Sequence, residues 1–344
     1  MPLADLDVRN KILYSSIAGL KKIPTAQRPV FLLVGWRGDK VVVKHETSPS
    51  VDASVVKFSN TVMRAVDPAV KIVPLDPQEV TEIRDWIADR LQEVADNLRV
   101  GIADQAKPDE LYFNQMMNAP GQWTKMAPEQ GFTSLDDAHN AFQAAHRDKG
   151  PVKKFAAALN APGGLEALGA IVVADAFSGN SDRFHPGIWD STGGYMTGAN
   201  GNYKALVNIG NVILTEDGNG KLRPIGLDPI ETGASIQTQL NSTLAVLDPN
   251  NEWAGYILAS TAVAQARLRG YAEMIVDDLN LALGARSRRL PGLRKQRLEQ
   301  NAAIRLLNGM NTAKLQLAQK LRDRVTSGKA TPQLILDKMN ALAW

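Results

Sequence analysis

The sequence predicts an α+β protein with two lobes and a helical C-terminal extension. Two β-branched apolar runs near the start, 29–35 and 40–46, are typical of paired strands. A second strand–turn–strand pattern occupies 205–227, where an Asp-Gly-Asn-Gly turn reverses the chain. Beyond residue 251 the apolar residues recur at helical spacing. These changes of pattern predict three parts: an N-lobe at 1–118, a C-lobe at 119–250 and a helical region at 251–344.

Composition excludes several classes of function. The chain has 344 residues, enough for one large or two medium domains, and a formal net charge of only +3. Such a weak net charge gives no reason to expect nucleic acid as a partner. The absence of cysteine excludes disulfides, thiolate nucleophiles and iron–sulfur clusters. The four histidines have no tight metal-ligand spacing, so a dedicated zinc site is not expected.

The hydropathy pattern contains no expected membrane span. No run approaches the roughly 20 apolar residues that a spanning helix needs. The N-terminus, MPLADLDVRNK, lacks the apolar core of a signal peptide. We therefore expect a soluble protein that is cytoplasmic, or secreted as an effector without a cleavable signal.

Helix-start signals divide the first part of the chain. Ser50 is a candidate N-cap for a helix whose apolar stripe runs from Val51 to Val66. A short strand is expected at 71–75. Asp76 then suits an N-cap, because Pro77 follows it and Glu79 stands three residues later, as in a capping box.

The middle of the chain alternates apolar and polar segments. A strand is predicted at 110–117, followed by a polar, loop-rich stretch at 120–150 that contains one helix near 134–147. Residues 165–177 are apolar almost all round, which predicts a buried helix. The Gly-, Asn- and Ser-rich segment 187–204 is predicted to be an excursion.

Four polar groups in this framework point to phosphoryl transfer. Lys44 ends a strand before a helix, and Asp182 follows the buried helix. Asn211 opens the second hairpin, and Asp228 follows its return strand. Each of them alone is typical of a surface, turn or helix-end residue. Together they supply a lysine for phosphates, a carboxylate for the acceptor, and an amide and a carboxylate for Mg²⁺.

The order of motifs resembles the atypical branch of the protein-kinase-like superfamily, with its phosphatidylinositol 3/4-kinases and HipA-like kinases. Those families carry D-R-H-x-x-N or N-T-D-R-x-x-x-N, then N-I-L, a hairpin and an aspartate in an I-D-x-G-like motif. The matching stretches here are 180–183 (NSDR), 211–214 (NVIL) and 226–229 (GLDP). The stretch 111–121 (LYFNQMMNAPG) is similar to the segment where these kinases hold adenine. The resemblance covers roughly residues 10–245.

The resemblance implies a two-lobed protein-kinase-like fold and an ATP- and Mg²⁺-dependent phosphotransferase. It implies Asp182 and Arg183 as catalytic residues and Asn211 and Asp228 as metal ligands. Asn208 competes with Asn211 for that role. The implied cofactor-binding residues are Lys44, Met116, Met117 and Ala119.

The sequence departs from the family pattern in four places. Between Asp182 and Asn211 lie 28 residues, so an insertion has to loop out. Phe184 stands where the family has histidine, and the metal motif contains Leu-Asp-Pro. No clear glycine-rich loop precedes Lys44, although 15–19 or 35–38 are candidates. The following helix has no glutamate to pair with Lys44, which leaves Glu46, Glu79 or Glu82.

These departures leave other functions open. A kinase fold could instead carry out adenylylation or glutamylation, act on a lipid or small molecule, or be a pseudokinase. A non-catalytic helical interaction protein is the alternative outside the enzymes. We expect a protein acceptor, because no cationic loop stands near the expected activation segment, 229–245. The basic stretch from Arg286 to Arg297 could bind an acidic partner, or be a solvated face.

Overall fold

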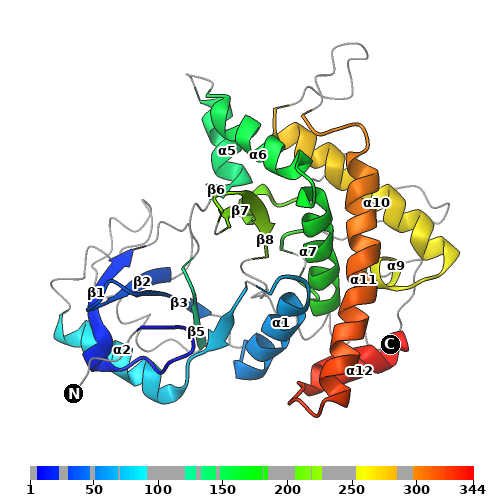
Figure 1. Cartoon of the computed structure of the whole chain (residues 1–344). Coiled ribbons are helices and arrows are strands. Elements are labelled where there is room, and N and C mark those ends of the chain that lie inside the picture. Colours follow the sequence, from blue (N-terminus) through cyan, green and yellow to red (C-terminus); the bar gives the residue numbers. More distant parts are fainter. Residues whose placement is uncertain are drawn as a thin grey trace, which may run out of the picture. The chain divides into compact units, whose positions relative to one another are not determined.

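The computed structural model shows a mixed α+β protein made of two compact units (Figure 1). The first unit contains the described residues up to Asn60 and those from Val70 to Pro128. The second contains Thr61–Pro68 and the described residues from Thr133 onward. The structure describes residues 6–22, 30–46, 51–68, 70–90, 121–128, 133–144, 148–180, 182–184, 206–217, 219–226, 253–284 and 297–344.

The first unit is built on a five-stranded antiparallel sheet with the order β1-β2-β3-β5-β4. The hairpin predicted at 29–46 is confirmed as β2 and β3, and the strand predicted at 71–75 as β4. The segment 15–19, a candidate glycine-rich loop, instead forms a 3-10 turn and the start of β1. The strands are β1 (Ile17–Lys22), β2 (Val30–Gly35), β3 (Lys40–Glu46), β4 (Ile72–Pro74) and β5 (Gln122–Met126).

Strand β5 corrects the prediction that its segment is a loop. It lies between β3 and β4, so it is internal to the sheet. Its sequence, QWTKM, lacks the apolar alternation of a typical internal strand. Lys125 is nevertheless buried there, because Glu79 pairs with it at 2.5 Å. A polar strand that is neutralised by another element cannot be recognised from its own residues.

Helix α2 (Pro77–Asp89) covers one face of this sheet. Its predicted start is confirmed: the Asp76 side chain accepts from the Glu79 backbone N–H at 2.9 Å, and Glu79 completes the capping box. Buried Ile83, Trp86 and Ile87 face the core residues of β2 and β3. Because side chains alternate across a strand, this face carries Val41, Val43 and His45, whereas Lys44 and Glu46 lie on the other.

Helix α1 (Ala53–Val66) begins later than the sequence predicted. Asp52 caps it, accepting from the backbone N–H groups of Ser54 and Val55 at 2.8 and 2.9 Å. An aspartate accepts these bonds as well as a serine does, so either residue could be the N-cap. Ser50, the predicted cap, lies outside the described residues.

The second unit is mainly helical and is centred on α7 (Gly164–Ser178). The sequence predicted a buried helix at 165–177, and this is confirmed. Helix α7 packs along α11 (Ala302–Thr326), as Figure 1 shows. Gly169 and Gly309 allow this, because a Cβ at either would lie within about 2.5 Å of the other helix's backbone.

The remaining elements of this unit flank the α7–α11 pair. Strand β7 pairs with both β6 and β8, and the predicted hairpin is confirmed as β7–β8. The helical prediction beyond 251 is confirmed for the described residues, and Thr261 is the N-cap of α10. The elements are β6 (Thr133–Ser134), β7 (Ile213–Glu216), β8 (Leu222–Ile225), α5 (Leu135–Gln143), α6 (Gly150–Asn160), α9 (Trp253–Leu258), α10 (Ala262–Ala282) and α12 (Gln333–Leu342).

Within the described part of the chain, no single helix has the length and apolar character needed to cross a membrane. Helices α6 and α7 meet these criteria only as a pair, and the pair is bent by 82°.

Candidate functional site

Helix α7 ends in a way that directs the following loop. Gly179 adopts a left-handed conformation with φ of 80°, which ends the helix at little steric cost. The Asn180 N–H then bonds back to the Asp175 carbonyl at 2.9 Å. Asn180 Oδ1 in turn accepts from the Asp182 N–H at 3.1 Å. Asn180 thus links the end of the apolar helix to Asp182 through these two hydrogen bonds.

A buried ion pair anchors this turn to α7. Arg183 Nη1 donates to both carboxylate oxygens of Asp175, at 2.9 and 2.7 Å, and Arg183 Nε donates to the Asn211 carbonyl at 3.0 Å. Both side chains are at most 1% exposed. Burial raises the pKa of Asp175 to about 6, although the Arg183 charge acts in the opposite direction. Arg183 therefore ties together the helix, the turn and the segment that carries Asn211.

Asp182 is exposed, and two asparagine side chains hold it. Asn211 Nδ2 donates to Asp182 Oδ2 at 2.8 Å and to the Asp182 carbonyl at 3.1 Å. Asn208 Nδ2 donates to the same carbonyl at 2.9 Å and more weakly to Asp182 Oδ1, at 3.4 Å. The carboxylate consequently has a fixed orientation while remaining accessible to solvent.

The chain between Asp182 and Asn211 returns to its point of departure. Phe184 and Val207 form an antiparallel bridge, and the Asn208 N–H donates to the Arg183 carbonyl at 3.0 Å. Asp278 of α10 accepts from the Leu206 N–H at 2.6 Å. The described residues on either side of 185–205, a segment outside the described residues, are therefore joined to one another. This joining brings Asp182 and Asn211 as close together as a short loop would.

The structure distinguishes the two candidate asparagines. Asn208 Oδ1 accepts from the Gly210 N–H at 3.2 Å, where it caps a 3-10 turn (Ile209–Asn211). Asn208 thus uses its amide oxygen locally. Asn211 uses its amide nitrogen to hold Asp182, so its oxygen remains the better candidate for a metal ligand. A carboxylate beside an amide oxygen is a donor set that suits Mg²⁺.

Lys44 belongs to the first unit, and its glutamate partner is now identified. Lys44 Nζ lies 2.8 Å from Glu46 Oε1, and both side chains are buried. The other two candidates have other partners. Glu79 pairs with Lys125 and caps α2, and Glu82 accepts from the Tyr14 N–H at 2.8 Å. The lysine and its partner therefore come from one strand, two residues apart.

Four of the predicted site residues lie outside the described residues: Met116, Met117, Ala119 and Asp228. The same holds for the expected strand at 110–117, the expected activation segment at 229–245 and most of the basic stretch that starts at Arg286. The structure thus brings together Asp182, Arg183, Asn208 and Asn211, and it places Lys44 in the other unit.

Sequence reasoning missed three buried charged residues around this site. Asp175 carries a carboxylate in an otherwise apolar helix segment, and this isolated charge is the sequence signal that could have identified it. Asp278 lies among the core positions of α10, and burial raises its pKa to about 6. Lys338 of α12 is also buried, and its amino group contacts the Phe177 carbonyl in the last turn of α7. No local pattern marks Asp278 or Lys338.

Among the residues that the structure describes, no three His, Asp or Glu side chains are grouped so that they could hold a metal ion. Comparison of the chain with protein-family models, with curated proteins and with solved structures found no match.

Proposed function

We propose that this protein is an ATP- and Mg²⁺-dependent phosphotransferase of protein-kinase-like design that acts on a protein hydroxyl. The observation that carries the proposal is the 2.8 Å hydrogen bond between Asn211 and Asp182, which are 29 positions apart in sequence. In protein kinases a catalytic-loop aspartate and a metal-binding asparagine are neighbouring parts of one site. The joined ends of the 185–205 insertion support the same pairing here.

Asp182 is proposed as the catalytic aspartate. The acceptor hydroxyl oxygen would form a bond to the γ-phosphorus as the bond from that phosphorus to the bridging oxygen breaks. The hydroxyl proton would pass to the Asp182 carboxylate, and ADP would leave. Asn208 and Asn211 orient this carboxylate, and Arg183 positions the loop through Asp175. Positioning of this kind is the main contribution that a protein makes to phosphoryl transfer.

Asn211 and Asp228 are proposed to hold Mg²⁺, which would neutralise charge on the phosphates. Mg²⁺ sites in such enzymes use one or two protein carboxylates together with substrate oxygens. A site with few protein ligands is therefore compatible with the absence of a three-acid cluster among the described residues.

Lys44 is proposed to contact the α- and β-phosphates. It lies on the third strand of its sheet and precedes α1, which is the place of the ATP-binding lysine in protein kinases. In those kinases the partner glutamate comes from the following helix, whereas Glu46 comes from the same strand here. Glu46 can nevertheless hold the Lys44 side chain in one orientation.

A calorimetric titration with ATP, with and without Mg²⁺, tests the nucleotide site. Binding should require Mg²⁺ and should be lost in Asp228→Ala, whereas Asp323→Asn, at an exposed residue of α11, should bind as wild type does. Lys44→Met has a matched control in Lys125→Met, because both variants remove the lysine of a buried Lys–Glu pair in the same sheet. The proposed role of Lys44 fails if both variants weaken ATP binding equally.

The reaction itself is tested with labelled ATP and a mixture of candidate protein acceptors. Label should transfer from the γ-phosphate and not from the α-phosphate, and Asp182→Asn should reduce transfer by at least about 100-fold without abolishing ATP binding. Transfer of the α-label would indicate adenylylation. ATP binding that ignores Mg²⁺ would indicate a pseudokinase, and a folded protein that binds no ATP would exclude the proposal.

A further inference from the structure

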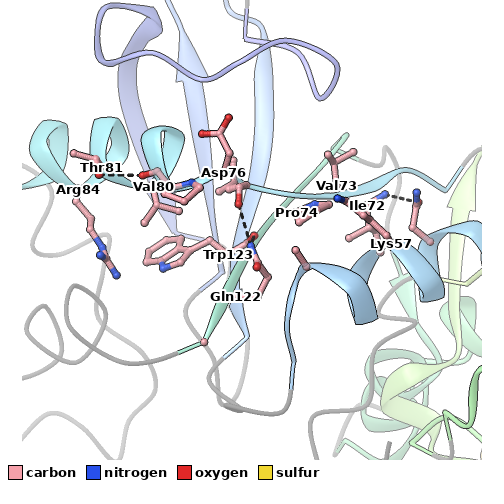
Figure 2. Close-up of a pocket in the computed structure, with 15 residues that line it drawn as sticks. Lys57, Ile72, Val73, Pro74, Asp76, Val80, Thr81, Arg84, Gln122 and Trp123 are labelled. Atoms are coloured by element: carbon pink, nitrogen blue, oxygen red, sulfur yellow. Dashed lines mark hydrogen bonds between the residues drawn. The ribbon is translucent and has the colours of Figure 1, made fainter. Parts of the chain in front are cut away.

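The first unit contains a pocket that the proposed phosphotransfer does not use. It has a volume of about 730 Å³, within the range of small-molecule sites. Figure 2 shows its lining, which comes from α1, β4, the first turns of α2 and the start of β5. Ile72, Pro74 and Val80 contribute apolar surface.

Most polar groups of the lining already have partners within the protein. Asn60 Oδ1 accepts from the Ile72 N–H at 2.9 Å, and Gln122 Nε2 donates to the Leu75 carbonyl at 3.0 Å (Figure 2). Asp76 caps α2 and pairs with Lys11 at 3.0 Å. These groups therefore have little hydrogen-bonding capacity left for a ligand.

Two hydrogen-bond donors of the lining are exceptions. Arg84 Nε and Trp123 Nε1 are both buried, and neither has a hydrogen-bond partner in the described part of the protein. Trp123 is only 2% exposed. A buried donor without an acceptor costs about 1–3 kcal/mol, so such groups in a folded protein call for an explanation. Both atoms can donate and neither can accept, so the missing partner has to supply acceptors.

Among the described residues, no carboxylate pairs with the charge of Arg84. Its guanidinium lies 5.9 Å from the centre of the Trp123 ring, and burial lowers its pKa with no carboxylate acting against this. His45 stacks on the same indole at 4.9 Å, and its pKa falls to about 4, because of burial and the nearby Arg84 charge. His45 is therefore neutral near pH 7 and supplies no counter-charge. A ligand that completes this cluster has to carry negative charge.

The edge of the sheet excludes an extended peptide as the occupant. Strand β4 is the edge strand, and the N–H groups of Val73 and Leu75 point towards β5. On the outer side, Asn60 occupies the Ile72 N–H, and Pro74 has none to offer. A peptide cannot extend the sheet without these donors.

We propose that this pocket binds a small organic carboxylate, whose oxygens accept from Arg84 Nε and Trp123 Nε1 and whose apolar body contacts Val73 and Val80. One guanidinium matches the single charge of a carboxylate. Trp123 lies on the sheet face that carries His45 and that α2, with Arg84, covers; this face is opposite to the face of Lys44. The two donors are therefore on the other side of the sheet from the proposed phosphate lysine, and the ligand does not depend on the phosphotransferase proposal.

Three probes of similar size test the proposal: 4-phenylbutyrate, its neutral amide 4-phenylbutyramide, and phenyl phosphate. The readout is the indole ¹H–¹⁵N resonance of Trp123, which is assigned by its disappearance in Trp123→Phe. Phenylbutyrate at millimolar concentration should shift this resonance downfield, and the amide should not. An equal shift with the amide, a shift with phenyl phosphate alone, or no shift with any probe would each overturn the proposal.

Substitutions of two arginines then test where the carboxylate group of phenylbutyrate binds. Arg84→Gln should weaken phenylbutyrate binding, measured by calorimetry, by at least about tenfold. Arg64→Gln, at an exposed arginine of α1 outside the pocket, should leave it unchanged. Arg84→Gln should also unfold at the same temperature as the ligand-free wild type or at a higher one, because it removes a half-buried cation that no described carboxylate pairs with. Undiminished binding in Arg84→Gln would overturn the proposal.

Discussion

The amino group of Lys338 in α12 donates to the backbone carbonyl of Phe177, in the last turn of α7. The last carbonyls of a helix have no intrahelical partner, and a cation at this end interacts favourably with the helix dipole. The same ammonium lies 5.5 Å from the centre of the Phe177 ring, on which Trp344 stacks at 5.4 Å. Helix α12 thus caps the helix that presents Asp182.

Lys338 should make the stability of the protein depend on pH in the alkaline range. Burial lowers the pKa of Lys338 from 10.5 to about 7. Between these two values the unfolded chain binds a proton that the folded chain does not, so stability rises with pH at up to about 1.4 kcal/mol per unit. Urea unfolding from pH 6 to pH 10 should therefore show a smaller rise for Lys338→Met than for wild type.

Lys329→Met is the control for this series, because Lys329 is exposed. It should follow the wild-type pH dependence. A Lys338→Met protein whose stability rises as steeply as that of wild type would show that Lys338 remains protonated in the folded state.

The buried pair of Asp175 and Arg183 should behave as a unit. Arg183→Met leaves the Asp175 carboxylate buried without its counter-charge and should destabilise the protein by about 3–5 kcal/mol. Asp175→Leu combined with Arg183→Met removes both charges and should recover most of that loss. Urea unfolding of the single and double variants forms the double-mutant cycle.

ATP titration provides a second readout of the same cycle. The double variant should fold well yet bind Mg²⁺-ATP more weakly than wild type, because Arg183 also holds the Asn211 carbonyl. If the double variant is no more stable than Arg183→Met, the pair is not coupled and this description of the loop is wrong.

The sequence predicted those elements whose signals are local. The Asp76–Glu79 capping box, the β2–β3 hairpin and the apolar helix α7 follow from neighbouring residues, and the structure confirms them. Strand β5 was missed because the partners of buried Lys125, Glu79 and the Asn10 carbonyl, are 46 and 115 positions away in the sequence. Asp52 was missed as the α1 cap because Ser50 offered a similar signal.

The residues of the candidate site show the same difference between local signals and long-range contacts. Asp182 and Asn211 were proposed from their order in the chain, but nothing between them predicts the Phe184–Val207 bridge that brings them together. Lys338 and Asp278 act over distances of 161 and 72 positions along the chain. Hydrogen bonds between buried charged side chains and residues far away in the sequence depend on the tertiary fold, so single-sequence patterns do not predict them.

The glycines between α7 and α11 should be intolerant of substitution. A Cβ at Gly309 would lie 2.4 Å from the Glu166 carbonyl oxygen, which belongs to rigid helix backbone. Gly309→Ala should therefore destabilise the protein by about 1–3 kcal/mol, even though alanine favours helix. Gly19→Ala, at a position with open space around it, is the control in the same thermal-unfolding measurement. Unchanged stability of Gly309→Ala would mean that the two helices are further apart.

Asp278 should contribute a pH dependence of the opposite sign to that of Lys338. Burial raises the pKa of Asp278 from 3.8 to about 6, despite hydrogen bonds from the Leu206 and Val207 N–H groups. The folded chain therefore binds a proton that the unfolded chain does not, and stability falls as pH rises from about 4 to about 6. Asp278→Asn, which keeps an acceptor for Leu206, should show a fall that is smaller by about 3 kcal/mol. The remaining fall would come from other carboxyls such as Asp175, whose pKa is also raised to about 6. Asp278→Ala removes the acceptor and should also weaken ATP binding, because the end of the insertion at Leu206 is released. If both variants follow the wild-type pH curve in urea unfolding, Asp278 is not the titrating group.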